Sequence, residues 1–349
     1  MRVVLFCVLI ALPLFPVFAG VEYPSGVSVG NKNNPRVSLS GFSRLSQVQR
    51  EQVSTTISAF TSSFGNQVFL PTAVSVVKSQ GGPKYEFGVV SAGLPYSVTL
   101  DGKLHTKSFE KSLPLLLHEV SHQIAESQMY SIFTENRPQV LWALASRFDD
   151  RGRDGSLAFI ESTKQKLGQT RSAEEILEEY FMIGVYSDLV HELLADTYTV
   201  AFLVSKNTAN AADAIYENIA FPGLRGSEAG EQNKQAKYRR FNSITGPLTP
   251  GEISESAESS HTATYIARNF VWKNLLKSTR PPSMHRFGNG MLNALVNAYA
   301  ELTQDFTKEP TIFRDGSYDV PTLNRAFIKA ICAEFRISPC SDMALGPIN

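Results

Sequence analysis

Residues 115–127 read LLLHEVSHQIAES, a largely apolar run with two histidines four positions apart and a glutamate directly after the first. On an α-helix, His118 and His122 lie one turn apart on the same face, so both imidazoles can reach one ion. Glu119 is rotated by about a quarter turn, which places its carboxylate beside a water on that ion. The pattern predicts two zinc ligands, with Glu119 as the general base. The alternative is a buried helix whose histidines bond to backbone carbonyls.

A catalytic zinc also needs a third protein ligand, because water takes only its fourth position. Glu126 continues the same helix, but it lies about 12 Å along the axis from His118, which is too far for one shared ion. A better candidate lies in residues 187–204, SDLVHELLADTYTVAFLV, where apolar residues cover almost the whole helical wheel. A helix of this kind is expected to be buried.

The polar residues of this second segment fall on one narrow stripe: Asp188, Glu192, Asp196 and Thr199. Buried carboxylates must be paired, protonated or bound to metal. We therefore predict that Glu192 is the third ligand and that Asp196, one turn on, holds a ligand histidine through its second nitrogen. Two alternatives remain open, a solvated acidic stripe and His191 as the ligand, although His191 points away from the face of Asp196.

Together, HEVSH at 118–122 and HELLADTYT at 191–199 resemble the gluzincin metallopeptidases, in which a Glu-x-x-x-Asp motif on a second helix completes the site. The Glu-x-x-Ala-Asp spelling is most similar to the family of the CAAX prenyl endopeptidase and the membrane peptidase HtpX. The resemblance implies that three residues bind Zn²⁺, namely His118, His122 and Glu192. It also implies that Glu119 is the general base and that Asp196 supports the ligands from behind.

The same family carries a further histidine, closely followed by an arginine, which helps to stabilise the oxyanion. SSHTATYIAR, residues 259–268, offers His261 and Arg268 for this role, without the proline that usually follows the family's histidine. His261 follows two serines able to cap a helix, so we expect it at a helix start. His285 and Tyr198 are rival candidates for the same role. The resemblance covers three islands, residues 113–126, 185–200 and 259–268.

The remaining pattern predicts an α+β fold, a mainly helical zincin-like domain with a small β-sheet before the histidine helix. Short β-rich runs between residues 66 and 104 predict the sheet. Helical spacing predicts helices at 43–64, 108–128, 136–148, 155–167, 171–183, 185–205, 208–219, 260–278, 287–304 and 321–334. Residues 221–258 are predicted to be a long irregular loop. The basic cluster KYRRF at 237–241 within it is predicted to be a solvated patch, with a role in substrate contact as the alternative. We place the domain at 42–349.

The N-terminus predicts export. Residues 1–19 combine one positive charge, an apolar run and small residues at the cleavage-site positions, which is typical of a secretory signal peptide. The alternative is an uncleaved anchor, for which the run is short. Residues 20–41, rich in Gly, Ser, Asn and Pro, are predicted to be a poorly ordered leader. Cys332 and Cys340, eight apart in an exported chain, predict a disulfide.

Composition limits the partners. The 349 residues hold 33 Lys and Arg against 33 Asp and Glu, so no charge excess points to nucleic acid or an anionic membrane surface. We expect a secreted or periplasmic zinc peptidase that acts on a peptide or protein, without stable membrane insertion after signal cleavage. Residues 87–100 are predicted to bind the peptide by strand addition at a sheet edge. The alternatives are a non-catalytic metal-binding or protein-interaction module and a zinc hydrolase of another bond type.

Overall fold

The computed structural model describes a little over half of the chain, and all structural statements below concern these residues. They are 38–40, 47–64, 73–77, 84–86, 97–101, 114, 117–118, 120–122, 124–125, 157–158, 161, 172–215, 237–303, 313–314 and 317–348. The predicted signal peptide, the predicted helix at 136–148, Glu119 and Glu126 lie outside them.

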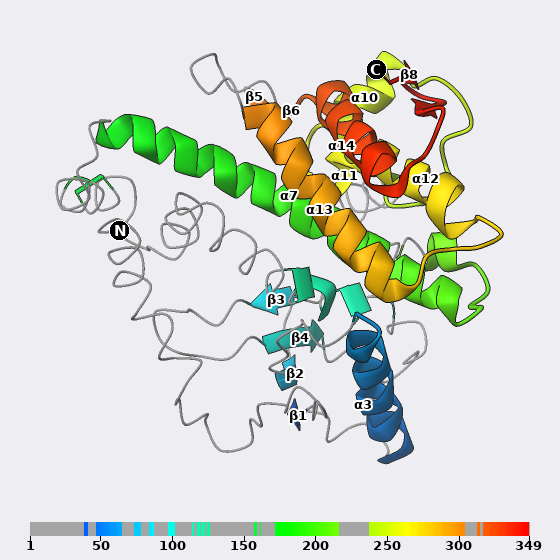
Figure 1. Cartoon of the computed structure of the whole chain (residues 1–349). Helices are drawn as coiled ribbons and strands as arrows, with labels where there is room; N and C mark the ends of the chain where they lie inside the picture. The colour runs from blue at the N-terminus through cyan, green and yellow to red at the C-terminus, as the bar shows by residue number, and fades with distance from the viewer. Residues whose placement is uncertain are drawn as a thin grey trace, which may run out of the picture.

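One long helix, α7 (Ala173–Ser205), organises the helical part of the molecule, and in Figure 1 it runs across the whole structure. Its start is a capping box, in which Ser172 Oγ accepts a hydrogen bond from the Glu175 N–H at 3.1 Å and Glu175 Oε2 accepts one from the Ser172 N–H at 2.8 Å. The prediction of two helices, 171–183 and 185–205, is wrong. A single glycine, Gly184, costs a helix only about 1 kcal/mol, which is too little to end it.

The other helical elements gather around the second half of α7. Helices α11 and α12 contact α7 directly, and α13 packs both on α7 and on α14. In Figure 1, α13 crosses α7, and α14 lies beside α13. The bounds are α3 (Gln47–Ser62), η3 (Ala211–Asp213), α10 (Pro250–Ser256), α11 (Ser260–Ala263), α12 (Tyr265–Val271), the π-helical turn η4 (Trp272–Leu276), α13 (Met284–Thr303) and α14 (Val320–Phe335).

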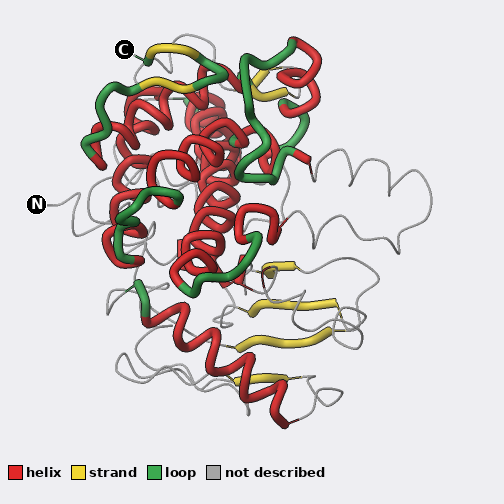
Figure 2. Tube along the Cα trace, turned by 90° about the vertical axis from the view of Figure 1, so that its right-hand side faces the viewer, coloured by secondary structure: helices red, strands yellow, loops and turns green. Residues whose placement is uncertain are grey.

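A small mixed sheet of four strands lies below most of the helices, at the level of α3, in the order β1-β2-β4-β3 (Figure 1 and Figure 2). β1 (Ser38–Ser40) and β4 (Ser97–Asp101) each pair parallel with β2 (Ala73–Val77), and Ala73 stands opposite both Ser38 and Ser97. β3 (Lys84–Glu86) pairs antiparallel with β4, with Tyr85 opposite Val98. The described residues are thus mostly helical with a small sheet, in agreement with the predicted α+β class.

Two strand predictions need correction. β1 lies inside residues 20–41, the predicted poorly ordered leader, so at least Ser38–Ser40 belong to the sheet. β4 lies between β2 and β3, which occupies both of its hydrogen-bonding sides. The described end of the 87–100 segment is therefore an inner strand and is not available for peptide addition at an edge.

The segment predicted to be irregular, 221–258, contains a helix. α10 begins with a capping box, because Thr249 Oγ1 accepts from the Glu252 N–H and Glu252 Oε2 accepts from the Thr249 N–H. Pro250 occupies the first helical position, where its missing N–H costs nothing. The letters TPGE at 249–252 are a helix-start signal, and the loop prediction overlooked them.

A single apolar core joins α7, α12, α13 and α14. Its fully buried rings include Phe60, Tyr198, Phe270, Phe287 and Phe327. Two very short hairpins, β5 (Phe313–Arg314) with β6 (Ser317–Tyr318) and β7 (Ser341–Asp342) with β8 (Gly346–Pro347), flank the last helix. In the described part of the chain, no helix combines the length and apolar character needed to cross a bilayer.

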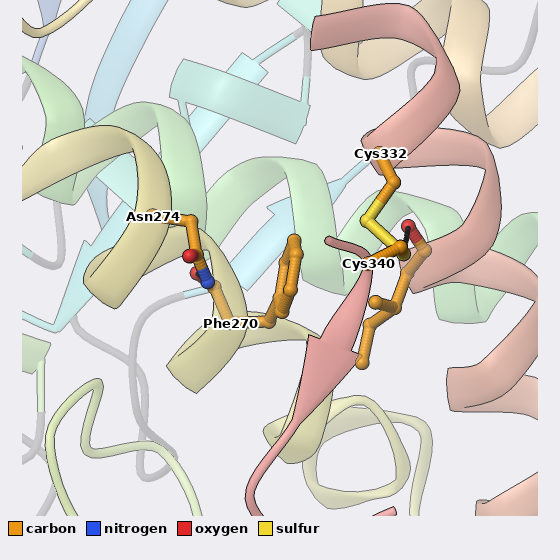
Figure 3. The surroundings of a disulfide bond; sticks show 5 residues. Phe270, Asn274, Cys332 and Cys340 are labelled. Atoms are coloured by element: carbon orange, nitrogen blue, oxygen red, sulfur yellow. Dashed lines mark hydrogen bonds between the residues drawn. A yellow bond between two sulfur atoms is a disulfide. The ribbon is translucent and has the colours of Figure 1, made fainter. Parts of the chain in front are cut away.

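A disulfide fastens the C-terminal residues to this core. Cys332 of α14 is bonded to Cys340, with an S–S distance of 2.09 Å and a sequence separation of 8. Figure 3 shows Phe270 of α12 beside the bond. The bridge therefore lies on the helical layer, where Cys332 itself is buried.

Candidate metal centre

Two segments far apart in the sequence bring three candidate ligands together. The described residues between 114 and 125 are helical and carry His118 and His122, while Glu192 comes from the middle of α7. His118 Nε2 and His122 Nε2 are 3.1 Å apart, and each lies 3.5 Å from one oxygen of Glu192. All three side chains are buried, and their ligand atoms lie within 4.8 Å of one another. This group can bind a metal ion.

The separations suit a small tetrahedral ion. Ligand atoms about 2.0–2.1 Å from zinc at tetrahedral angles lie about 3.3 Å from each other, close to the distances found here. Within the described residues, Oε2 of Glu192 is buried without a hydrogen bond. A buried carboxylate oxygen of this kind is costly unless a cation satisfies it. Two imidazoles and a carboxylate are also a donor set that zinc accepts.

Asp196 fixes the orientation of one of these ligands. It lies one turn after Glu192 on α7, is 0% exposed, and places Oδ1 2.8 Å from His118 Nδ1. An ionised carboxylate at that distance holds the proton on Nδ1 and leaves the lone pair on Nε2, which faces His122 and Glu192. The structure thus places Asp196 in the supporting position that its sequence spacing predicted.

Two arginines also hold Asp196. Arg239 donates to Oδ1 from Nη2 at 2.6 Å and to Oδ2 from Nε at 3.2 Å, while Arg268 Nε lies 2.7 Å from Oδ2. Arg268, itself 0% exposed, also donates from Nη1 to the His261 carbonyl at 2.6 Å. It therefore connects α12, the start of α11 and the carboxylate on α7.

The charged neighbours control which groups of the site are ionised. Burial alone raises the pKa of Glu192, but the three surrounding histidines and Arg239 outweigh it and lower this pKa to about 2. Burial likewise raises the pKa of Asp196, yet the two arginines hold it well below the usual range. Burial lowers the pKa of His122 well below 6.5. At neutral pH the site thus presents two carboxylates and a neutral His122, the forms that bind metal.

His261 lies at the start of α11, as its two preceding serines predicted. Ser259 caps this helix by accepting a hydrogen bond from the His261 N–H at 3.2 Å. The ring turns toward the centre, with Nε2 3.3 Å from Glu192 Oε1, and its side chain stays 43% exposed. Glu192 raises the pKa of His261, but burial and Arg239 bring it below 6.5 overall. His261 is therefore a neutral imidazole between the buried ligands and solvent.

The rival residues lie elsewhere or act differently. His285 lies on α13, where its Nδ1 is 2.8 Å from the Phe64 carbonyl. The Tyr198 hydroxyl donates a hydrogen bond to the Gly288 carbonyl at 3.0 Å. His191 is buried with its ring 5.8 Å from that of His122, outside the group of three ligands. Glu192, Asp196 and Thr199 are buried, which contradicts the alternative of a solvated acidic stripe.

Arg239 is the main residue that the sequence analysis misassigned. The basic cluster at 237–241 was predicted to be a solvated patch, but Arg239 is 6% exposed and Phe241 is 0% exposed. Within this cluster, only Lys237 and Arg240 keep partly exposed side chains. The available signal for burial was the pair of aromatic residues beside the arginines, Tyr238 and Phe241. A basic run that is fully solvated does not need aromatic side chains within it. Two buried carboxylates on α7 also required cations from elsewhere in the chain.

Comparison with known proteins finds no matching family model, no matching curated protein and no matching solved structure. The assignment of a function therefore depends on the residues and their geometry.

Proposed function

We propose that this protein is an exported, zinc-dependent metallopeptidase of the gluzincin type. The observation that carries the proposal is the buried convergence of His118, His122 and Glu192, with an ionised Asp196 behind His118. The sequence HEVSH adds a glutamate in the position of a general base. A ligand set, a base and an oriented histidine together are the parts that hydrolysis of a peptide bond needs.

Zn²⁺ held by the three ligands would polarise the scissile carbonyl and lower the pKa of water towards neutrality. Glu119 takes a proton from the attacking water and passes it to the leaving amine. Asp196 keeps the proton of His118 on Nδ1, so that Nε2 remains a donor of its lone pair. His261, partly exposed and next to Glu192, donates a hydrogen bond to the substrate oxygen on which negative charge develops.

Substitution of the base separates this proposal from a non-catalytic metal-binding module. Glu119→Gln removes the proton acceptor and leaves the three ligands intact, so peptidase activity falls at least about 100-fold while zinc binding persists. Glu126→Gln, on the same predicted helix, is the matched control and keeps both properties. The readouts are cleavage of a broad peptide library and the zinc content of each protein.

Equal cleavage by wild type and Glu119→Gln would remove the peptidase proposal. Zinc bound by a well-folded wild type that cleaves no peptide would favour the non-catalytic module or a hydrolase of another bond. Ester and amide substrates in the same screen distinguish these two.

A further inference from the structure

The segment that carries Arg239 is held firmly against the helices. Residues 238–244, here called the strap, follow no regular helix or strand. Its backbone is fastened at two points, because the Phe241 N–H donates to the Ala212 carbonyl at 3.1 Å and the Ile244 N–H donates to Asn269 Oδ1 at 2.9 Å. These two hydrogen bonds fix the backbone of the strap and therefore fix the position of Arg239 at the site.

Arg239 approaches the same atoms that a metal ion requires. With its proton on Nδ1, His118 carries its lone pair on Nε2, and Arg239 Nη2 lies 3.3 Å from this nitrogen. The same Nη2 is 3.6 Å from Oε2 of Glu192. The positive charge of Arg239 therefore lies next to the position that a metal ion would occupy between these two atoms, and two cations so close repel each other.

Among the described residues of the site, the buried charges are balanced before any ion binds. Glu192 and Asp196 supply two negative charges, and Arg239 and Arg268 supply two positive ones. A divalent cation added to this set meets a positive neighbour within a few ångströms, in surroundings that screen charge poorly. Without the charge of Arg239 the same set would be negative, while Asp196 would keep Arg268 and His118 as partners.

We propose that Arg239 is a built-in competitor of the metal ion, which keeps the metal-free site folded and neutral and weakens its affinity for Zn²⁺. This inference rests on the metal site of the proposed function and does not depend on peptidase activity. Arg239 then has two effects: it stabilises the metal-free protein, and it lowers the affinity of the site for Zn²⁺.

The test measures the Kd for Zn²⁺ of the full-length protein by competition with a chromophoric chelator. Arg239→Gln is expected to bind Zn²⁺ about tenfold more tightly, within the range by which groups around metal ligands change affinity. Arg239→Met, of similar length and without charge, is a second variant with the same expectation. Arg239→Lys, which keeps the charge, is expected to stay within about threefold of wild type.

Arg240→Gln is the matched control, because it removes the same charge one residue further along the strap. Its side chain is 41% exposed and pairs with Asp213 at 3.4 Å, away from the ligands. The Kd for Zn²⁺ of this variant is expected to equal that of wild type.

Thermal unfolding with and without Zn²⁺ excludes a merely structural role. Loss of packing alone would lower both midpoints equally and leave the zinc-induced shift unchanged, whereas the proposal predicts a larger shift in Arg239→Gln. If wild type binds Zn²⁺ and neither uncharged variant binds it more tightly, this inference is wrong and the metal site stands. If neither wild type nor any variant binds Zn²⁺, both this inference and the proposed metal site are wrong.

Discussion

The charged interior around Asp196 and the apolar layer between α13 and α14 are both buried, but they are assembled differently. The charged interior joins side chains from four segments, at His118, Asp196, Arg239 and Arg268, through contacts of 2.6–2.8 Å. The apolar layer joins two neighbouring amphipathic helices through side chains such as Leu295 and Phe327. We infer that the layer provides stability, whereas the interior provides chemistry and adds stability only while its charges remain paired.

The largest expected effect comes from the apolar layer. Phe327 is 0% exposed and its ring centroid is 5.9 Å from that of Tyr186. Phe327→Ala is expected to lower the free energy of unfolding by about 3–5 kcal/mol through lost burial and a cavity. Chemical denaturation measures this, with Val48→Ala as control, because Val48 is 72% exposed and should change stability by less than about 0.5 kcal/mol. If a folded Phe327→Ala protein bound Zn²⁺ more weakly than wild type, the apolar layer and the charged interior would not be independent.

Acid is expected to act on the charged interior. In the folded protein the pKa of Glu192 is about 2, against 4.5 for a free glutamate. A lowered pKa means that the unfolded chain binds the proton more tightly, so the stabilisation is complete above pH 4.5 and is lost as pH falls toward 2. The loss for the metal-free protein is on the order of 3 kcal/mol.

Denaturation of chelator-treated protein across this pH range measures that loss. Glu192→Gln, which cannot ionise, should show a shallower decline than wild type. Parallel curves for the two proteins would mean that the carboxylate is not stabilised by its neighbours in the folded state.

The disulfide is expected to have the next largest effect. Replacing both Cys332 and Cys340 by Ser frees a loop with a sequence separation of 8 and should lower the free energy of unfolding by about 2–3 kcal/mol. Because the bridge lies on the helical layer, the stoichiometry and Kd of Zn²⁺ should not change. Thermal unfolding of the double variant, beside metal titration, checks both statements, and a loss of metal would show that the layer also shapes the site.

The smallest expected effect on stability comes from Tyr198, which tests where the boundary between the two regions lies. It lies on α7 only two residues beyond Asp196, but its buried hydroxyl donates to the Gly288 carbonyl of α13. Tyr198→Phe should cost about 1 kcal/mol of stability through this one hydrogen bond and leave activity and metal binding unchanged. A selective fall in kcat at unchanged stability would instead assign Tyr198 to the oxyanion.

The two regions also differ in how far the sequence could predict them. Helical periodicity placed α13 and α14 within three residues at each end, because each is a local pattern with one apolar face. The spacing of His118 and His122, and of Glu192 and Asp196, likewise predicted which ligands share a face. These predictions depend only on residues within one or two helical turns.

The partners of Asp196 could not be predicted in the same way. Arg239 reaches the carboxylate across 43 residues, from a strap whose position depends on Ala212 and Asn269. No local period encodes such a contact. Arg268 was noted only for its spacing after a histidine, and its ion pair with Asp196 was not foreseen. The sequence thus predicted which three candidate ligands come together, and the tertiary structure was needed to find the charges that surround them.

The central claim is that His118, His122 and Glu192 form one metal site. The most direct test is the metal content of the purified protein beside Glu192→Ala, with Asp188→Ala, one turn earlier on α7, as control. We expect one zinc per chain in wild type and in Asp188→Ala, and its loss or sharp weakening in Glu192→Ala. A well-folded wild type that binds no metal, even when zinc is offered, would contradict the claim and leave the two histidines in an ordinary buried helix.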